Sequence, residues 1–284
     1  MAKRESKKGL FIALIYFLII TGLGIFSGYF VGNIIASKYF SINKYEDITT
    51  NMLRDDLSKI NYKNKTPDQF DSAIAFQIAE QVMIASTKYE ARGTGLIKTS
   101  LGVDQVSTSI DTRDGDDLYF GFTTYSSLVK VSKQSNYKIG GPIKIQDGTP
   151  TDGTIENVNW QNKYNEYTWD EYYDVFGKYA NYNCCVVVSS KTVSEDLGVE
   201  KDGDLYKFSV VLDPGISTVG YVKQVGNNAG INPSEIVFHE INLTFWIDKD
   251  FRFVKQVKYE SYTLPYGGID VILYVDNEMV FEIE

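Results

Sequence analysis

An uncharged segment, residues 9–37, constrains this chain more than any other feature. Most of its side chains are apolar, and Lys7, Lys8 and Lys38 flank it. A run well beyond about 18 residues, at about 1.5 Å per residue, is long enough to cross the roughly 30 Å hydrocarbon core of a bilayer as an α-helix. Backbone polar groups inside lipid must be satisfied within the segment, which favours one helix. The sequence therefore predicts a transmembrane signal-anchor helix over residues 9–37.

The charges beside this segment predict its orientation. Residues 1–8 hold four basic side chains and one acidic one, a net charge of +3, whereas the charges just after Lys38 are mixed. The more basic flank of a membrane helix tends to stay in the cytoplasm. We therefore expect a single-pass protein of the cell membrane, with a cytoplasmic tail (1–8) and with residues 38–284 extracytoplasmic.

A cleaved signal peptide is the alternative interpretation of the same residues. Its apolar core is usually about 7–15 residues long and is followed by small residues, a pattern that Leu10–Ile20 and then Gly22-Leu23-Gly24 resemble. The apolar run continues to Ile35, however, and cleavage near Gly24 would leave that part exposed. The uncleaved anchor is favoured, and cleavage stays an open alternative.

Small residues recur at intervals of four along the predicted membrane helix, at Gly24, Gly28, Gly32 and Ala36. This spacing lets two helix backbones approach closely, so these four residues are a candidate helix-packing face and a possible homodimer contact. Glycine is also common in membrane helices that do not pair. Both interpretations remain open.

Charge and cysteine content exclude several classes of protein. The whole chain carries −9, and removing the +3 of residues 1–8 leaves −12 on the remainder, which argues against binding nucleic acid. The two cysteines, Cys184 and Cys185, are adjacent, so a disulfide-stapled scaffold is excluded. Buried small side chains are the favoured interpretation of this pair, and a vicinal disulfide or a redox role is the alternative.

Catalytic and metal-binding patterns are weak throughout the sequence. The single histidine, His239, excludes multi-histidine zinc sites and makes a His-based triad with Cys184 or Cys185 depend on chance proximity. Ser127–Lys130 and Ser135–Lys138 both fit Ser-x-x-Lys, but neither begins a predicted helix and no Lys-Thr-Gly accompanies them. We expect no enzymatic activity, no cofactor and no metal site.

Four carboxylates near three aromatic residues form the strongest remaining candidate for chemistry. Paired carboxylates beside aromatic rings are typical of glycoside-active sites. Spacings of three and four residues fit a solvated helix face equally well, and this interpretation is favoured. The carboxylates are Glu166, Asp170, Glu171 and Asp174, and the aromatic residues are Trp169, Tyr172 and Tyr173.

Helical patterns come first in the part of the chain beyond residue 37. Residues 38–66 predict a stalk or helical linker with a weak apolar stripe, and residues 67–284 predict the main domain. Thr66, Pro67 and Gln69 match a helix start with a capping box, and apolar residues then recur every four positions. The sequence thus predicts a helix over residues 67–87.

The remainder alternates with period two and predicts mainly strands. Residues 134–159, rich in Gly, Pro, Asp and Thr, predict a long loop, while Thr168 with Glu171 predicts the capped start of a short helix ending near Gly177. A second short helix is expected over Gly215–Gly226. The predicted strands are Tyr89–Leu101, Gln105–Thr112, Leu118–Thr124, Cys184–Ser190, Leu205–Leu212, Glu240–Ile247, Phe251–Thr263 and Ile269–Ile283.

Tight turns between these strands indicate antiparallel pairing. Asp114-Gly115 and Asp202-Gly203 introduce similar hairpins, because these residue types tolerate positive φ. Asp248-Lys249-Asp250 and Pro265-Tyr266-Gly267-Gly268 join the last three strands. Sequential strands with short turns predict a mainly antiparallel sheet.

This order of elements resembles a known family. An amphipathic helix leads into strands with an Asp-Gly-Asp turn, and the chain closes with Leu243–Asp250 running into Phe251–Lys255. The pattern, over about residues 67–284, is similar to the LolA/LolB lipoprotein carriers and the LppX/LprG-type surface lipoproteins. The resemblance implies a curved antiparallel sheet, an incomplete barrel, that wraps helices around a cavity for acyl chains. Many relatives carry a lipidated Cys where this chain has residues 9–37.

Together these features predict an α+β fold in which an N-terminal transmembrane helix precedes a curved, mainly antiparallel sheet packed on helices. Two functions remain open. The first is a membrane-tethered extracytoplasmic binding protein for a hydrophobic or lipid-like ligand. The second is a cell-surface structural or protein-interaction domain that binds no small molecule.

Overall fold

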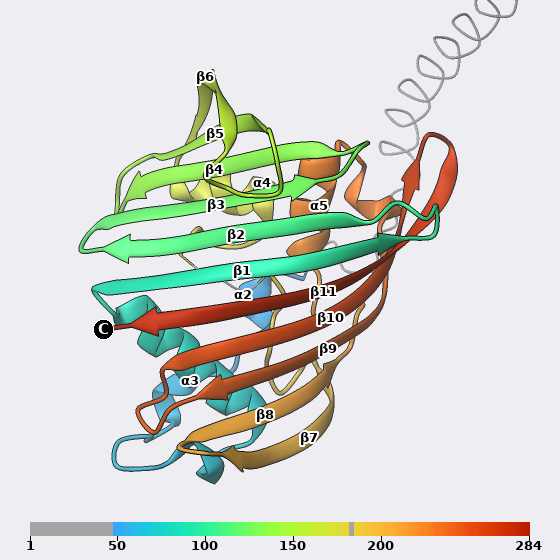
Figure 1. Ribbon diagram of the computed structural model, residues 1–284. Coiled ribbons are helices and arrows are strands. Elements are labelled where there is room, and N and C mark those ends of the chain that lie inside the picture. Colours follow the sequence, from blue (N-terminus) through green and yellow to red (C-terminus); the bar gives the residue numbers. More distant parts are fainter. Residues whose placement is uncertain (1–47, 182–184) are drawn as a thin grey trace, which may run out of the picture. The chain divides into compact units, whose positions relative to one another are not determined.

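In the part of the chain that the structure describes, eleven antiparallel strands form one continuous sheet (Figure 1). The computed structural model describes residues 48–181 and 185–284, which belong to a compact unit spanning Tyr45–Glu284. The strand order is β6-β5-β4-β3-β2-β1-β11-β10-β9-β8-β7, so the first six strands form one half of the sheet and the last five form the other. The two halves join where β1 pairs with β11.

Seven of the predicted strands lie close to strands of the structure, whereas four strands, at 130–138, 143–150, 158–167 and 193–202, were not predicted. The bounds of all the strands in the described residues complete the sheet. They are β1 (Lys88–Thr99), β2 (Gln105–Asp114), β3 (Asp117–Tyr125), β4 (Lys130–Lys138), β5 (Ile143–Pro150), β6 (Val158–Tyr167), β7 (Val193–Asp202), β8 (Leu205–Leu212), β9 (Val237–Ile247), β10 (Phe253–Tyr266) and β11 (Ile269–Ile283). In β8 buried and half-buried residues alternate without exception, as expected for a strand with one face on the core.

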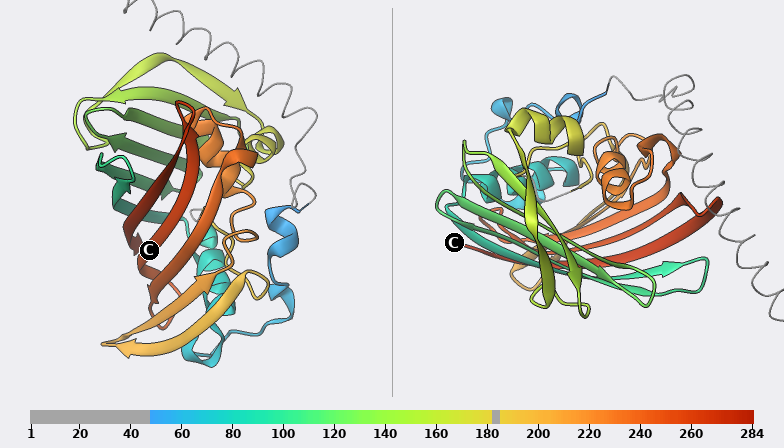
Figure 2. Two further views of the ribbon diagram at one scale, coloured as in Figure 1. Left: turned by 90° about the vertical axis from the view of Figure 1, so that its right-hand side faces the viewer. Right: turned by 90° about the horizontal axis from the view of Figure 1, so that it is seen from above.

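Helices in the described residues are few and short, and they lie on one face of the curved sheet (Figure 2). They are α2 (Thr50–Leu53), α3 (Ser72–Ala85), α4 (Trp169–Phe176) and α5 (Tyr221–Ala229), with 3₁₀ turns at Leu57–Lys59, Pro67–Gln69 and Pro233–Glu235. We call the side of the sheet that they cover the helix-facing side and the opposite side the outer face.

The predicted α+β class with an N-terminal transmembrane helix is wrong for this structure. Within the described residues no helix is both long and apolar enough to cross a membrane. One antiparallel sheet of eleven strands dominates the fold. The expectation underestimated the sheet because residues 134–159, predicted as a loop, contain most of β4, β5 and the start of β6. The segment 9–37 lies outside the described residues.

Two local features explain why the sequence pattern did not predict these strands. Gly140-Gly141-Pro142 does not open a long loop; it turns β4 into β5, with Gly140 at φ 76°. Gly148 and Pro150 lie inside β5, although both residue types weaken strands. Trp160 of β6 covers Gly148, because a Cβ there would lie 2.6 Å from the Trp160 ring.

Other boundaries differ in detail. The predicted helix over 67–87 is a 3₁₀ turn followed by α3, whose true N-cap is Asp71, since its side chain accepts a hydrogen bond from the Ile74 amide at 2.8 Å. The predicted strand over 184–190 is wrong for its described residues, because Val186, Val187 and Val188 lie in irregular backbone and are buried there. α5 begins at Tyr221, inside the helix expected over 215–226.

The predicted turns are confirmed. Gly115 and Gly203 both have φ 61°, and each follows an Asp at the tip of a two-residue hairpin. Gly267 and Gly268 turn β10 into β11 with φ 61° and 85°. Thr168 and Glu171 form the expected capping box of α4, which ends at Gly177 in the left-handed conformation.

Candidate functional site

Side chains on the helix-facing side fall into rows that run across several strands. One row contains Phe122, Ser109, Gly93, Met279 and Gln256, and the next contains Thr124, Ser107, Gly95, Asn277 and Lys258. Residues paired across neighbouring strands point to the same face. Gln256 pairs with Phe245, whose ring contacts Phe76 of α3 at 5.2 Å, so these rows face the helices.

Two separate hydrophobic clusters are buried on the helix-facing side. The larger cluster packs α3 against β8–β11 and includes Phe76, Phe208, Phe245 and Phe253. The smaller cluster packs α4 against β3–β5 and consists of Leu118, Tyr137, Ile143, Ile145, Tyr172 and Phe176. The larger cluster is therefore covered by α3 and also by Tyr221, Val222 and Val225 of α5, whereas α4 covers the smaller one.

Between the two clusters the sheet is only partly covered. The strands that cross this region are β11, β1, β2 and β3, and most of their helix-facing side chains are half-buried. Helix-facing side chains with solvent contact show that the helices leave this part accessible. We call seven residues of this region the middle strip: Gly93, which is buried, and Gly95, Ser107, Ser109, Phe120, Phe122 and Met279, which are half-buried.

Small residues make the floor of the middle strip low. A Cβ at Gly93 would lie 2.3 Å from Ser109 Oγ, and one at Gly95 would lie 3.1 Å from the Asp276 carbonyl oxygen. Glycine in a strand interior weakens the strand and often marks close approach of another group. Ser109 Oγ and Met279 Cε, which would lie 2.3 Å and 3.4 Å from a Cβ at Gly93, therefore pack over this glycine.

A polar cluster adjoins the middle strip on β10. Gln256, Lys258 and Glu260 alternate along the strand and all face the helices. The Tyr221 hydroxyl of α5 donates a hydrogen bond to Glu260 Oε1 at 2.6 Å, and Lys258 Nζ lies 2.7 Å from Glu260 Oε2. We call Tyr221, Gln256, Lys258 and Glu260 the β10 polar cluster.

Burial shapes the electrostatics of this cluster. Glu260 is 1% exposed, so its charge requires a partner, and Lys258 supplies it. The Lys258 ammonium also lies 4.5 Å from the centre of the Tyr221 ring. Burial, followed by the nearby Glu260 charge, raises the pKa of Tyr221 well above its ordinary value, so Tyr221 stays a neutral donor.

On the other side of the strip, Asp111 of β2 is a buried acid. Its Oδ1 accepts a hydrogen bond from the Tyr89 hydroxyl at 3.0 Å. Burial raises the pKa of Asp111 to about 6, against the opposing effects of Lys178 and the Tyr89 hydrogen bond. The Lys178 ammonium lies 6.0 Å from the centre of the Phe120 ring, at the edge of the strip.

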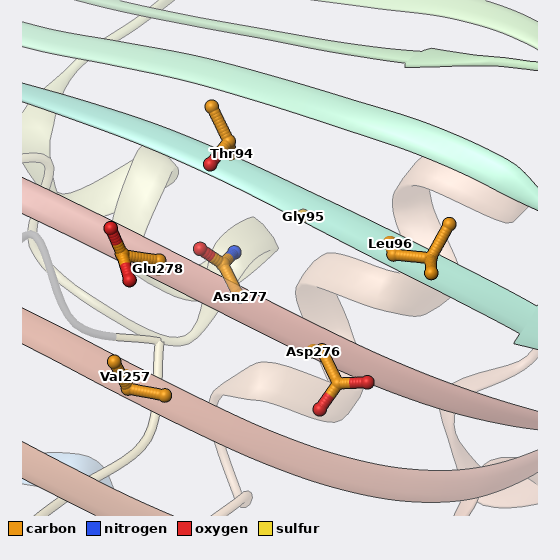
Figure 3. Close-up of a pocket in the computed structure, with 7 residues that line it drawn as sticks. All are labelled: Thr94, Gly95, Leu96, Val257, Asp276, Asn277 and Glu278. Atoms are coloured by element: carbon orange, nitrogen blue, oxygen red, sulfur yellow. The ribbon is translucent and has the colours of Figure 1, made fainter.

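The outer face carries a hollow of about 380 Å³ over β1, β11 and β10 (Figure 3). Figure 3 shows Thr94, Leu96, Val257, Asp276 and Glu278 projecting from the face opposite the helices. Glu278 is paired with Lys255 at 2.7 Å. Within the described residues no three His, Cys, Asp or Glu side chains are grouped to hold a metal ion. The hollow is open to solvent, and Glu278, one of its two carboxylates, is neutralised by Lys255. We therefore do not assign a functional site to it.

Most residues singled out from the sequence do not come together. The helix-packing face of Gly24, Gly28, Gly32 and Ala36 lies outside the described residues, as does Cys184. Cys185 is a half-buried free thiol. His239 is exposed, and its Nε2 lies 2.7 Å from Thr263 Oγ1. The four carboxylates near α4 are exposed, and Glu171 caps the helix through the Thr168 amide at 2.8 Å.

The Ser-x-x-Lys matches are also separated. Ser135 and Lys138 lie three residues apart on β4 and point to opposite faces, and Lys138 pairs with Asp117 at 3.3 Å. Ser127 is exposed in the turn before β4. Neither pair is arranged as a nucleophile and base.

Sequence reasoning missed both the middle strip and the β10 polar cluster. On β10 the helix-facing positions 256, 258 and 260 are polar, while Val257 and Tyr259 face outward. The usual rule is that the apolar side chains of a strand face the protein interior. Applied to residues 256–260, this rule would wrongly place Val257 and Tyr259 on the helix-facing side. The available signal was the alternation of polar Gln256, Lys258 and Glu260 with apolar Val257 and aromatic Tyr259.

Comparisons with known proteins give no family for this chain. No family model matches, and no curated protein matches the sequence. Among solved structures, a LolA superfamily protein from Nitrosomonas europaea is similar with a TM-score of 0.25 and 8% identity, covering 74% of this chain and 93% of that one. A de novo designed transmembrane β-barrel reaches 0.18 with 6% identity, covering 69% and 97%. These TM-scores carry no argument about function.

Proposed function

We propose that this protein binds an elongated hydrophobic or lipid-like ligand along the middle strip. The observation that carries the proposal is the interruption of the core: half-buried Phe120 and Phe122 lie between two buried clusters on one face, next to Ser107 and Ser109, and half-buried Met279 packs against the edge of the larger cluster. A sheet face that only needed a packed interior would carry larger apolar side chains at the two serine positions. Small residues at the bottom and apolar ones at the sides suit a flexible apolar chain.

The expected affinity follows from apolar area. Each methylene group that leaves water contributes about 0.8 kcal/mol, so about ten of them correspond to about 8 kcal/mol. Association and ordering of a flexible chain offset part of this gain. We therefore expect dissociation constants in the micromolar range or weaker.

Filling the floor of the strip tests the proposal. Ser109→Leu places a branched side chain between Gly93 and Phe122, whereas the control Thr94→Leu makes a similar change on the outer face of β1. The purified full-length chain and both variants are titrated with a dansyl-labelled undecanoic acid. We expect Ser109→Leu to weaken binding by about tenfold or more, which corresponds to about 1.4 kcal/mol, and Thr94→Leu to leave it unchanged.

Two results would overturn the proposal. One is absence of saturable binding to the full-length chain. The other is equal binding by wild type, Ser109→Leu and Thr94→Leu, which would place any apolar binding elsewhere. Urea unfolding of the three proteins shows that each variant is folded under the conditions of the titration.

A second candidate function, protein interaction without a small-molecule ligand, is favoured by exposed apolar side chains at one end of the sheet. Leu101, Leu128, Tyr266 and Ile269 are 51%, 71%, 62% and 53% exposed. They lie at the β1–β2, β3–β4 and β10–β11 turns, which the antiparallel order puts at the same end. Photo-crosslinking from position 128 in intact cells tests it: one reproducible partner, lost in Tyr266→Ser, supports this function, and no adduct opposes it.

A further inference from the structure

Gln256 is a buried side chain with an unused hydrogen-bond donor, its Nε2. It is 7% exposed, and among the described residues its Nε2 has no hydrogen-bond partner. Gln224 of α5, one helical turn from Tyr221, has an Nε2 in the same condition. A buried donor left unsatisfied costs about 1–3 kcal/mol, so a protein gains from supplying it with an acceptor.

The position of Gln256 relates this donor to the middle strip. It lies in the row that runs through Ser109, Gly93 and Met279, two strands away from Gly93. Neighbouring strands are about 4.8 Å apart, so Gln256 begins about 10 Å from the glycine floor. In that row Met279 lies between Gly93 and Gln256, so Gln256 is the first polar side chain that a ligand meets beyond Met279 on the way to β10.

The charges of the β10 polar cluster restrict the kind of group that fits. Lys258 and Glu260 are ion-paired at 2.7 Å and neutralise each other. The Tyr221 hydroxyl is already used as a donor to Glu260. An added anion would thus lose its hydration without meeting a net positive charge, which is unfavourable in a buried site. The unused donor at Gln256 instead suits a neutral oxygen acceptor.

We propose that the β10 polar cluster recognises an uncharged carbonyl group, as in an ester or amide, at the head of a hydrophobic ligand, with Gln256 Nε2 donating the hydrogen bond. This inference rests on the proposed function, because it assigns the head-group end of the same site. The middle strip then holds the hydrocarbon chain, and Gln256 distinguishes ligands of equal length by their polar end.

Three probes of similar length separate head-group recognition from chain binding. They are methyl dodecanoate, which has an ester carbonyl; tridecane, which has none; and dodecanoate, which is an anion. Each displaces the dansyl-labelled undecanoic acid from the full-length chain. We expect wild type to bind methyl dodecanoate about tenfold or more tighter than tridecane, as one buried hydrogen bond allows, and dodecanoate no tighter than the ester.

Gln256→Leu removes the amide while keeping a side chain of similar size. We expect this variant to lose the preference for the ester, with tridecane binding within about threefold of wild type. The control is Gln134→Leu, since Gln134 lies on the outer face, where it bonds Gln146 at 2.6 Å. This control should retain the full preference.

The outcomes distinguish the two proposals. If wild type binds tridecane and the ester equally, or if Gln256→Leu keeps the ester preference, the head-group inference is wrong and chain binding stands. Dodecanoate binding about tenfold tighter than the ester would also overturn it, because a charged head would then be recognised. If no probe displaces the dansyl ligand, the proposed function itself fails.

Discussion

Asp111 illustrates how one buried residue couples the fold to pH. Its pKa is about 6 in the folded protein because burial disfavours the carboxylate, whereas the pKa of an Asp in an unfolded chain is about 3.9. Between these two values the folded state keeps a proton that the unfolded state has lost. The free energy of unfolding therefore falls as pH rises through this window, by up to about 3 kcal/mol.

Asp111→Asn tests this coupling. Asparagine cannot ionise and can still accept the Tyr89 hydrogen bond, so we expect the variant to lose that fall in stability between about pH 4 and pH 6. Urea unfolding at several pH values measures it, with Asp114→Asn, exposed on the same strand, as the control. An unchanged pH profile in Asp111→Asn would contradict the assignment.

Gly177 is required by the approach of two backbones. It ends α4 at φ 73°, and a Cβ there would lie 2.5 Å from Gly220 Cα. We expect Gly177→Ala to destabilise the protein by more than about 1 kcal/mol, since positive φ and a backbone clash act together. Gly203→Ala is the matched control: φ is 61° but no atom lies within 4 Å of the added Cβ. If urea unfolding gives the same loss of stability for Gly177→Ala and Gly203→Ala, the contact with Gly220 adds no cost and this explanation is wrong.

Local signals predicted several elements well. The capping box of Thr168 and Glu171, the end of α4 at Gly177 and the bounds of β11 follow from turn and cap chemistry that acts over a few residues. Phe251 shows the limit of such signals. It was expected to begin a strand, but it occupies the β9–β10 turn at φ 59° and is 3% exposed, because Phe70 packs against it at 5.7 Å.

A buried ion pair attaches the segment before α3 to that helix. Arg54 forms an ion pair with Glu80 of α3, and Glu80 is 2% exposed. We expect Arg54→Met to cost about 3–5 kcal/mol, because it leaves a buried carboxylate without its partner. The double variant Arg54→Met with Glu80→Leu should recover most of this loss. Chemical denaturation of both variants measures it, and a larger loss in the double variant would oppose the explanation.

At the scale of the whole molecule, the two hydrophobic clusters differ greatly in size. Among the described residues, the cluster under α3 contains 27 buried residues, whereas the cluster under α4 contains six. Segments with fewer buried apolar contacts open at lower free energy. The sheet is continuous, but the half that contains β4 and β5 has fewer buried apolar contacts than the half that contains β9 and β10.

Hydrogen exchange should reveal this difference. We expect the amides of β4 and β5 to exchange faster than those of β9 and β10, because the smaller cluster secures β4 and β5. Mass spectrometry of the exchanging full-length chain, resolved by peptide, measures the protection. Uniform protection across all four strands would show that the two clusters unfold together.

The sequence by itself determined the local features: where most strands run, which hairpins are tight, and where α4 begins and ends. These depend on φ preferences and side-chain caps within a few residues. Only the tertiary structure decided that eleven strands join in one sheet, that β1 pairs with β11, and that Gly93 and Gly95 lie between two cores. Tyr89 lies opposite Ile283, near the far end of the chain. Strands so far apart in the sequence pair because pairing buries the apolar face of each strand against the core. A pattern within a few residues cannot specify which distant strand will be the partner.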